Sequence, residues 1–156
     1  MKQRQGSLSS DYLKKSIISM AGYSGTPLAK KLGFKPGARM AIERIPHDVE
    51  MELQSAISQC LKARKGPFDL VLLFAKTSSE LQEKLPWFAE QLNASGSLWA
   101  AWPKKASGVD SDLDGDRVRT IGLQNGLVDV KVCAISDIWS GLKFVFRVRD
   151  RVGLRR

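Results

Sequence analysis

Cysteine and histidine are scarce in this sequence, and long hydrophobic runs are absent from it. The 156 residues contain two cysteines, Cys60 and Cys133, and one histidine, His47. Two separated cysteines without a C-x-x-C pair indicate reduced thiols and a cytoplasmic location. A single histidine without a thiol or acidic cluster excludes a His-rich metal site. No window approaches the ~18 apolar residues of a membrane-spanning helix. We therefore expect one globular domain with no metal and no membrane partner.

Motifs of several enzyme classes are missing as well. The sequence has no G-x-S-x-G nucleophile elbow and no Walker-type phosphate loop. Residues 110–115 (DSDLDG) open like a calcium-binding loop, but the twelfth position, which must be a bidentate acid, is Ile121. This acidic run is therefore interpreted as a helix N-terminus, where carboxylates cap free N–H groups. His47 alone is a weak candidate for a general base, so no catalytic residue is predicted.

Positive charge is concentrated at the two ends of the chain. The formal net charge is +9, with seven Lys/Arg and one Asp in residues 1–37, and seven Lys/Arg and two Asp in residues 131–156. Basic ends without interleaved aromatic residues favour solvated tails, so nucleic-acid binding stays a weak alternative. The expected organisation is an N-terminal extension (1–22), flexible or short-helical, one α/β domain (23–148) and a basic C-terminal tail (149–156).

Hydrophobic periodicity predicts alternating strands and helices. Residues 68–75 (FDLVLLFA) form a continuous apolar run, which is typical of a parallel strand covered on both faces. Further strands are predicted at 38–43, 98–102, 127–135 and 142–148, and helices at 11–20, 27–31 and 112–124. Another helix, capped by Ser78 or Ser79, is predicted to continue until Ser95-Gly96 ends it. Residues 48–62 fit one amphipathic helix, or a helix to about Gln54 followed by an edge strand near residues 57–61. This order predicts an α/β sandwich whose five or six strands are mostly parallel and end in an antiparallel strand.

Polar side chains gather at the carboxyl edge of the predicted sheet, where open α/β sheets bind their ligands. Residues 96–108 (GSLWAAWPKKASG) supply a strand that ends there in a small basic loop. The candidate ligand-binding residues are Arg44, His47, Lys76, Thr77, Trp102, Lys104, Lys105, Ser107 and Gly108. Basic side chains with hydroxyl groups could hold a phosphate or carboxylate, so the expected partner is an anionic small molecule. The alternative is that the lysines are solvated and that Trp102 belongs to the core.

Several short segments resemble landmarks of class I methyltransferases. They are residues 35–39 (KPGAR), 68–71 (FDLV), 96–98 (GSL) and the terminal antiparallel pair. The resemblance implies a three-layer, Rossmann-like sheet. Such enzymes carry a G-x-G loop after the first strand, whereas this chain has residues 43–47 (ERIPH). Bulky side chains and a proline do not reproduce the close backbone approach of that loop, and no acidic residue for a ribose is identifiable after a second strand. We therefore predict no S-adenosylmethionine binding in the usual mode, and no other cofactor.

A second resemblance covers about residues 23–145. Residues 23–33 (YSGTPLAKKLG), 102–108 (WPKKASG), 127–134 (LVDVKVCA) and 139–144 (WSGLKF) are similar to an uncharacterised bacterial family known as domain of unknown function 3052. This resemblance implies a fold, and a pocket at the loop that contains Lys104, Lys105, Ser107 and Gly108, which we call the lysine loop. It implies no particular activity.

Taken together, these features predict a non-catalytic small-molecule or anion-binding, regulatory domain on a degenerate methyltransferase-like scaffold. One alternative is an enzyme of unidentified reaction that uses the edge containing Lys104 and Lys105. Another is a nucleic-acid or protein interaction module that uses the basic ends. The sequence leaves enzymatic activity open and favours its absence, because the glycine loop is missing.

Overall fold

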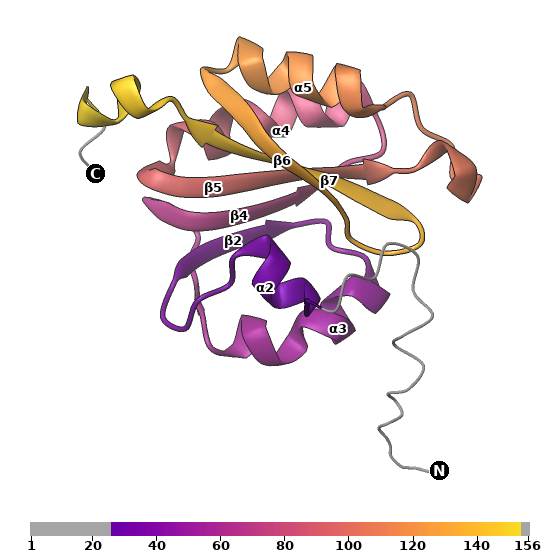
Figure 1. Ribbon diagram of the computed structural model, residues 1–156, viewed down its shortest axis with the longest axis horizontal. Coiled ribbons are helices and arrows are strands. Elements are labelled where there is room, and N and C mark those ends of the chain that lie inside the picture. Colours follow the sequence, from indigo (N-terminus) through magenta and orange to yellow (C-terminus); the bar gives the residue numbers. More distant parts are fainter. Residues whose placement is uncertain (1–25, 154–156) are drawn as a thin grey trace.

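In the part of the chain that the structure describes, six strands form one mixed sheet in the order β3-β2-β4-β5-β7-β6. The structure is a computed structural model that describes residues 26–153 (Figure 1). The strands are β2 (Arg39–Glu43), β3 (Leu61–Lys62), β4 (Phe68–Phe74), β5 (Leu92–Pro103), β6 (Leu127–Ala134) and β7 (Trp139–Phe146). The first four in spatial order are parallel, whereas β7 pairs antiparallel with both β5 and β6. The predicted fold class is confirmed: a three-layer, Rossmann-like sheet, mostly parallel and with antiparallel strands at one end.

Helices cover both faces of the sheet (Figure 1). On one face lie α2 (Leu28–Leu32) and α3 (His47–Ser58), and on the other lie α4 (Ser78–Glu90) and α5 (Gly115–Gln124). Two short 3-10 helices follow strands, η2 (Lys105–Ser107) after β5 and η3 (Val148–Gly153) after β7. No helix within residues 26–153 has the length and apolar character needed to cross a bilayer.

Strand β4 shows why the apolar run at its centre forms a buried parallel strand. Alternate residues face opposite layers: Leu70, Leu72 and Phe74 pack with α2 and α3, and Val71 and Leu73 pack with α4 and α5. All five side chains are at most 2% exposed. Burial of each contributes roughly 1.5–3 kcal/mol, so this strand anchors both cores and fixes the position of its carboxyl end.

The ambiguous stretch after β2 contains parts of both predicted alternatives. Helix α3 continues to Ser58, beyond the shorter helix expected, and the residues Leu61–Lys62 then form a two-residue edge strand. The chain turns at Gln59, whose carbonyl accepts a hydrogen bond from the Gly37 N–H at 2.8 Å. This edge strand pairs with β2 from Arg39 onward.

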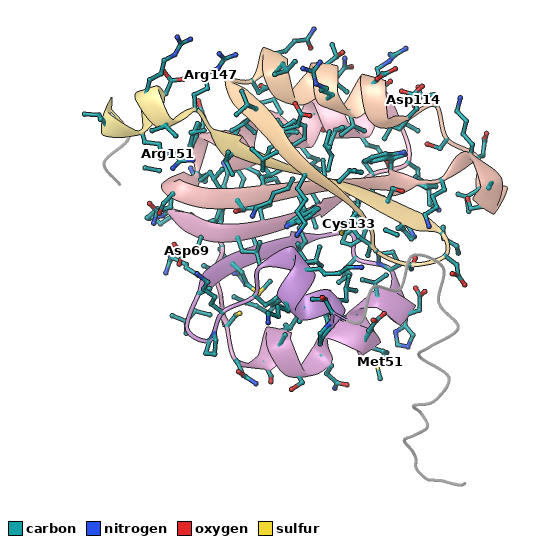
Figure 2. The ribbon with its side chains drawn as sticks, viewed as in Figure 1. Met51, Asp69, Asp114, Cys133, Arg147 and Arg151 are labelled. Carbon is teal, nitrogen blue, oxygen red and sulfur yellow. The ribbon has the colours of Figure 1, made fainter. Side chains whose placement is uncertain are left out.

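Several predicted boundaries differ from the structure, and the largest difference is the start of β5, which lies at Leu92 and not at Leu98. Helix α4 is capped by Thr77 and not by a serine, and it ends at Glu90, so that Leu92 pairs with Phe68 in the sheet. Strand β7 begins at Trp139, three residues before the predicted start. Helix α5 begins at Gly115 with Asp114 as its N-cap (Figure 2). The predicted helix at 11–20 lies outside the described residues.

Candidate functional site

A cavity of about 390 Å³ lies at the carboxyl edge of the parallel strands. Chain order reverses there, because β3 lies on one side of β2 and β4 on the other. Such a switch point leaves a crevice between the loops that leave the two strands, and open α/β sheets bind ligands in it. The lining residues are Arg44, Pro46, Asp48, Phe74, Ala75, Lys76, Glu80, Val109, Ile138 and Trp139.

Two aromatic rings form the apolar wall of the cavity. Phe74 ends β4 and Trp139 begins β7, and their ring centroids are 5.3 Å apart in an edge-to-face arrangement of 79°. Their side chains are 1% and 7% exposed, so both rings are fixed by packing in the core shared with α2 and α3. Because β7 is antiparallel, its first residue reaches the same edge as the last residue of β4. A rigid aromatic wall of this kind suits a flat or apolar part of a ligand.

One side of the cavity, which we call its lip, is charged. It contains Lys76 and Glu80 at the start of α4, and Arg44 after β2. The Glu80 carboxylate accepts hydrogen bonds from the backbone N–H groups of Lys76 (2.8 Å) and Thr77 (3.2 Å), while the Thr77 hydroxyl accepts one from the Glu80 N–H (3.0 Å). This reciprocal arrangement is a capping box. The Lys76 N–H is the largest influence that lowers the pKa of Glu80, and the Thr77 N–H and the Arg44 charge act in the same direction. Glu80 is therefore a firmly held carboxylate at the lip.

Arg44 lies opposite this carboxylate, 3.4 Å from Glu80 Oε2 through its Nη1 atom. Its side chain is 58% exposed, so the ion pair itself contributes at most about 1 kcal/mol. Arg44 has a φ of 60°, and it is the one non-glycine residue with a positive φ among residues 26–153. The chain therefore turns sharply between β2 and α3 in the left-handed conformation that usually belongs to glycine.

The segment between β5 and α5 is fastened to α4 beside the cavity. Asp112 accepts two hydrogen bonds from Ser78, one from the backbone N–H (2.7 Å) and one from the hydroxyl (2.9 Å). These bonds lower the pKa of the Asp112 carboxyl, with the backbone bond as the largest cause. Val109, on the same segment, lines the cavity. The acidic run thus has two capping roles, because Asp112 caps α4 and Asp114 caps α5 by accepting from the Arg117 N–H at 2.8 Å.

The predicted ligand-binding residues divide into two groups. Arg44 and Lys76 line the cavity. His47 is exposed as the first residue of α3, Thr77 is the N-cap of α4, and neither lines the cavity.

The lysine loop has mainly structural contacts. Lys104 donates from Nζ to the Ser136 carbonyl (2.9 Å) and from its backbone N–H to Ile138 (2.7 Å), which joins the end of β5 to the turn before β7. Ser107 donates to the Lys104 carbonyl at 2.6 Å, and Lys105 and Gly108 belong to the same 3-10 turn. The loop therefore lies at the expected edge of the sheet, but none of its four predicted residues lines the cavity: Lys104, Lys105, Ser107 and Gly108. Lys76, Lys104 and Lys105 were predicted to meet in one pocket. Of the three, Lys76 lines this cavity, whereas Lys104 and Lys105 do not.

Trp102 belongs to the core on the other face of the sheet. It is 7% exposed, and its ring lies against the position of Gly115 at the start of α5. The indole that lines the cavity is that of Trp139 instead. Because side chains alternate along β5, Trp102 and Ala101 face opposite cores, and only the core that contains Ala101 also contains Phe74 and Trp139.

Several lining residues were not predicted from the sequence. Glu80, Phe74, Val109, Ile138 and Trp139 are the main ones. A signal for Glu80 was present, because Thr77-x-x-Glu80 matches the sequence pattern of a capping box. Trp139 depends on where β7 begins, which periodicity placed too late.

Among the described residues, no cysteine lines the cavity and no cluster of metal-binding side chains is found. Burial raises the pKa values of the Cys60 and Cys133 thiols, and neither residue lines the cavity. Within residues 26–153, no group of three or more histidine, cysteine or acidic side chains is placed to hold a metal ion.

The fold is similar to that of several solved structures, some of which are described as methyltransferases. A structure described as a pericyclic reaction enzyme has a TM-score of 0.51 at 11% identity, over 78% of this chain and 47% of its own. A TehB-like S-adenosylmethionine-dependent methyltransferase from Corynebacterium glutamicum has a TM-score of 0.49 at 10% identity, over 88% of this chain and 95% of its own. A magnesium protoporphyrin IX methyltransferase from Synechocystis, with bound S-adenosylhomocysteine, has a TM-score of 0.49 at 13% identity, over 77% and 78%. The chain spans about half the length of the pericyclic enzyme. No family model matches the chain, and no curated protein matches it by sequence.

These comparisons correct two expectations. Because the solved structures of similar fold include S-adenosylmethionine-dependent methyltransferases, the expectations of a non-catalytic scaffold and of a site closed to that cofactor are not kept. The physical reason lies in the turn after β2. The expectation rested on the bulky side chains and the proline that replace the G-x-G loop, which were not expected to reproduce its close backbone approach. In the structure Arg44 nevertheless adopts there the left-handed conformation that glycine usually supplies. At these identities the likeness establishes the fold for this chain. Its activity depends on the residues of the cavity.

Proposed function

We propose that this chain is a methyltransferase that binds S-adenosylmethionine in the cavity at the switch point. The observation that carries the proposal is the position of this cavity between the carboxyl ends of β2 and β4, with an aromatic wall on one side and paired charges on the other. A crevice outside those strand ends is where an open α/β sheet takes a nucleotide-like ligand.

The residues present fit such a ligand in chemistry and in size. A cavity of about 390 Å³ falls within the range of small-molecule pockets. Phe74 and Trp139 would pack against the apolar and ring parts, and Arg44 and Lys76 would hold the carboxylate. Asp48 is the carboxylate available to ribose hydroxyls, because β3 is followed by Ala63, Arg64 and Lys65 and has no acidic residue at its end.

The contribution of the chain to such a reaction would be binding, orientation and exclusion of water. The bound cofactor supplies an electrophilic methyl group. The buried Phe74 and Trp139 would lower the local polarity, and the charges of Arg44 and Lys76 would fix the orientation of the ligand. No histidine lines the cavity, Glu80 is held by backbone N–H groups and Arg44, and Asp48 would face the ribose, so the acceptor would be a group that is already nucleophilic.

Isothermal titration with S-adenosylmethionine and S-adenosylhomocysteine tests the proposal. We expect saturable binding by the full chain and weaker binding by Arg44→Ala. Arg119→Ala is the matched control, because Arg119 is also an exposed arginine (55% of the side chain) in an ion pair, with Asp129 at 3.0 Å, and it does not line the cavity. Absence of any binding heat for both ligands at millimolar concentration would reject the proposed function.

Two finer predictions accompany this proposal. The first is membership of the family known as domain of unknown function 3052, which rests on the segments quoted from the sequence. The second is a cytoplasmic location with an anionic small molecule as partner; S-adenosylmethionine carries a net positive charge and would meet this expectation only through its carboxylate group. Binding of nucleic acid through the basic ends stays a weaker alternative, and it would be recognised by a steep dependence on salt concentration.

A further inference from the structure

We infer that Arg44 is a specificity-determining residue, which makes the cavity select ligands that bear a carboxylate or phosphate group. This inference rests on the proposed function only for the choice of this cavity as the ligand site. It adds the residue that recognises the ligand and the chemical group that is recognised.

The backbone of Arg44 is the first observation. Its φ of 60° is costly for a side chain with a Cβ atom and free for glycine. Each of the other positive-φ positions among residues 26–153 is a glycine: Gly33, Gly37, Gly108 and Gly126. A strained conformation that is kept at the lip of a cavity indicates that the side chain has a use there.

The contacts of Arg44 with the residues that the structure describes do not account for this strain. Its ion pair with Glu80 joins a side chain that is 58% exposed to one that is 30% exposed. A solvent-exposed ion pair adds about as much to the free energy of unfolding as the left-handed conformation takes away. Arginine with this ion pair therefore gives the fold no net gain in stability over glycine at this position. A ligand in the cavity would supply the missing interaction.

The surroundings of Arg44 set the sign of the ligand group. The Glu80 carboxylate already accepts two backbone hydrogen bonds, so it stays in place when the guanidinium turns toward a ligand. Lys76 lines the same cavity, and its backbone N–H is one of those donors. A planar guanidinium with an ammonium group nearby binds carboxylate and phosphate, often through two parallel hydrogen bonds.

Titration with ligand pairs that differ in a carboxylate- or phosphate-bearing end tests this inference. The first pair is S-adenosylhomocysteine, which ends in a zwitterionic α-amino acid, and 5′-methylthioadenosine, which ends in a methyl group. The second pair is AMP and adenosine, which differ by the phosphate. We expect the wild-type chain to bind the carboxylate- or phosphate-bearing member of at least one pair about tenfold more tightly, and Arg44→Ala to abolish that preference. Arg44→Lys should keep part of the preference, and Arg119→Ala should keep all of it.

Arg44→Gly separates recognition from folding. This variant should lose the preference for the carboxylate- or phosphate-bearing ligand while its Tm changes by less than about 2 °C, because the relief of the left-handed strain offsets the loss of the ion pair with Glu80. An unchanged preference in Arg44→Ala would overturn the inference, and so would a fall in the Tm of Arg44→Gly well beyond that range.

The two ligand pairs also distinguish this inference from the proposed function. If AMP is preferred over adenosine through Arg44 while both S-adenosyl compounds fail to bind, the inference stands and the proposed function falls. If wild-type protein binds neither S-adenosylhomocysteine nor AMP more tightly than the partner that lacks the carboxylate or phosphate, the inference falls whatever else binds.

Discussion

The Asp112 carboxylate caps the first turn of α4, although it belongs to the segment that leads into α5. Both of its oxygens accept from Ser78, at 2.7 Å from the backbone N–H and at 2.9 Å from the hydroxyl. Ser78 is buried, so its hydroxyl has no full access to water if this partner is removed. These two bonds fasten the segment that carries Val109 to the helix that carries Glu80, and both residues line the cavity.

Ser78→Ala should therefore lower the free energy of unfolding by about 1 kcal/mol, because it removes one hydrogen bond to a charged group and leaves the backbone bond in place. Chemical denaturation measures the loss. Ser79→Ala is the control, since Ser79 is exposed and should change the stability little. An equal loss in both variants would contradict the capping role given to Asp112.

Acid should weaken the fold through the same carboxylate. The Ser78 bonds lower the pKa of Asp112 in the folded state, so the unfolded chain binds more protons in acid. The stability that this group contributes is present above its ordinary pKa and is lost as the pH falls through the lowered folded value. We expect the free energy of unfolding to decline below about pH 4 and to decline less steeply in Asp112→Asn. Parallel profiles for the two proteins would contradict this assignment.

Glu80→Gln should separate the capping box from the charge of the lip. Glutamine can still accept from the Lys76 and Thr77 N–H groups, so the loss of stability should stay below about 1 kcal/mol. Removal of the carboxylate charge frees Arg44, and binding of an anionic ligand should become a few-fold tighter. Calorimetric titration measures the affinity, and weaker binding by this variant would show that Glu80 contacts the ligand itself.

Thr77→Ala removes the other side chain of the capping box. It removes the hydroxyl that accepts from the Glu80 N–H at 3.0 Å, so the helix N-terminus loses one of its caps. The expected loss is about 1 kcal/mol, read from the midpoint of chemical denaturation. Ligand affinity should change little, because Thr77 does not line the cavity.

Gly122→Ala should destabilise the packing of α5 on the sheet. A Cβ atom at Gly122 would overlap the ring of Phe144, which is buried in β7. We expect a loss of about 1–3 kcal/mol in the free energy of unfolding. Gly115→Ala is the matched control on the same helix, because the nearest atom to its Cβ would be Trp102 Cζ2 at 3.7 Å, an ordinary contact. Equal stabilities for the two variants would mean that α5 packs differently.

Much of the fold followed from the sequence, because the apolar run of β4 and the order of the elements depend on local patterns. The carboxyl edge was also predicted, since parallel strands must end on one side of a sheet. Which residues meet within that edge was harder to predict. Lys104 and Lys76 follow neighbouring strands, yet Lys104 bonds to the turn at Ser136, because β7 pairs antiparallel with β5 and brings that turn alongside.

Two further features could not be predicted from the local sequence pattern. The left-handed turn at Arg44 carries no glycine, so the usual residue signal for such a turn is missing. The role of Trp139 depended on the start of β7, which is fixed by its pairing with Pro103 and not by its own hydrophobicity.

A crystal structure grown in the presence of S-adenosylhomocysteine tests the central claim most directly. The account predicts electron density for the ligand in the cavity between the ends of β2 and β4, with its carboxylate at Arg44 and its apolar parts against Phe74 and Trp139. An empty cavity at saturating ligand, or density for the ligand at another surface of the chain, would contradict it.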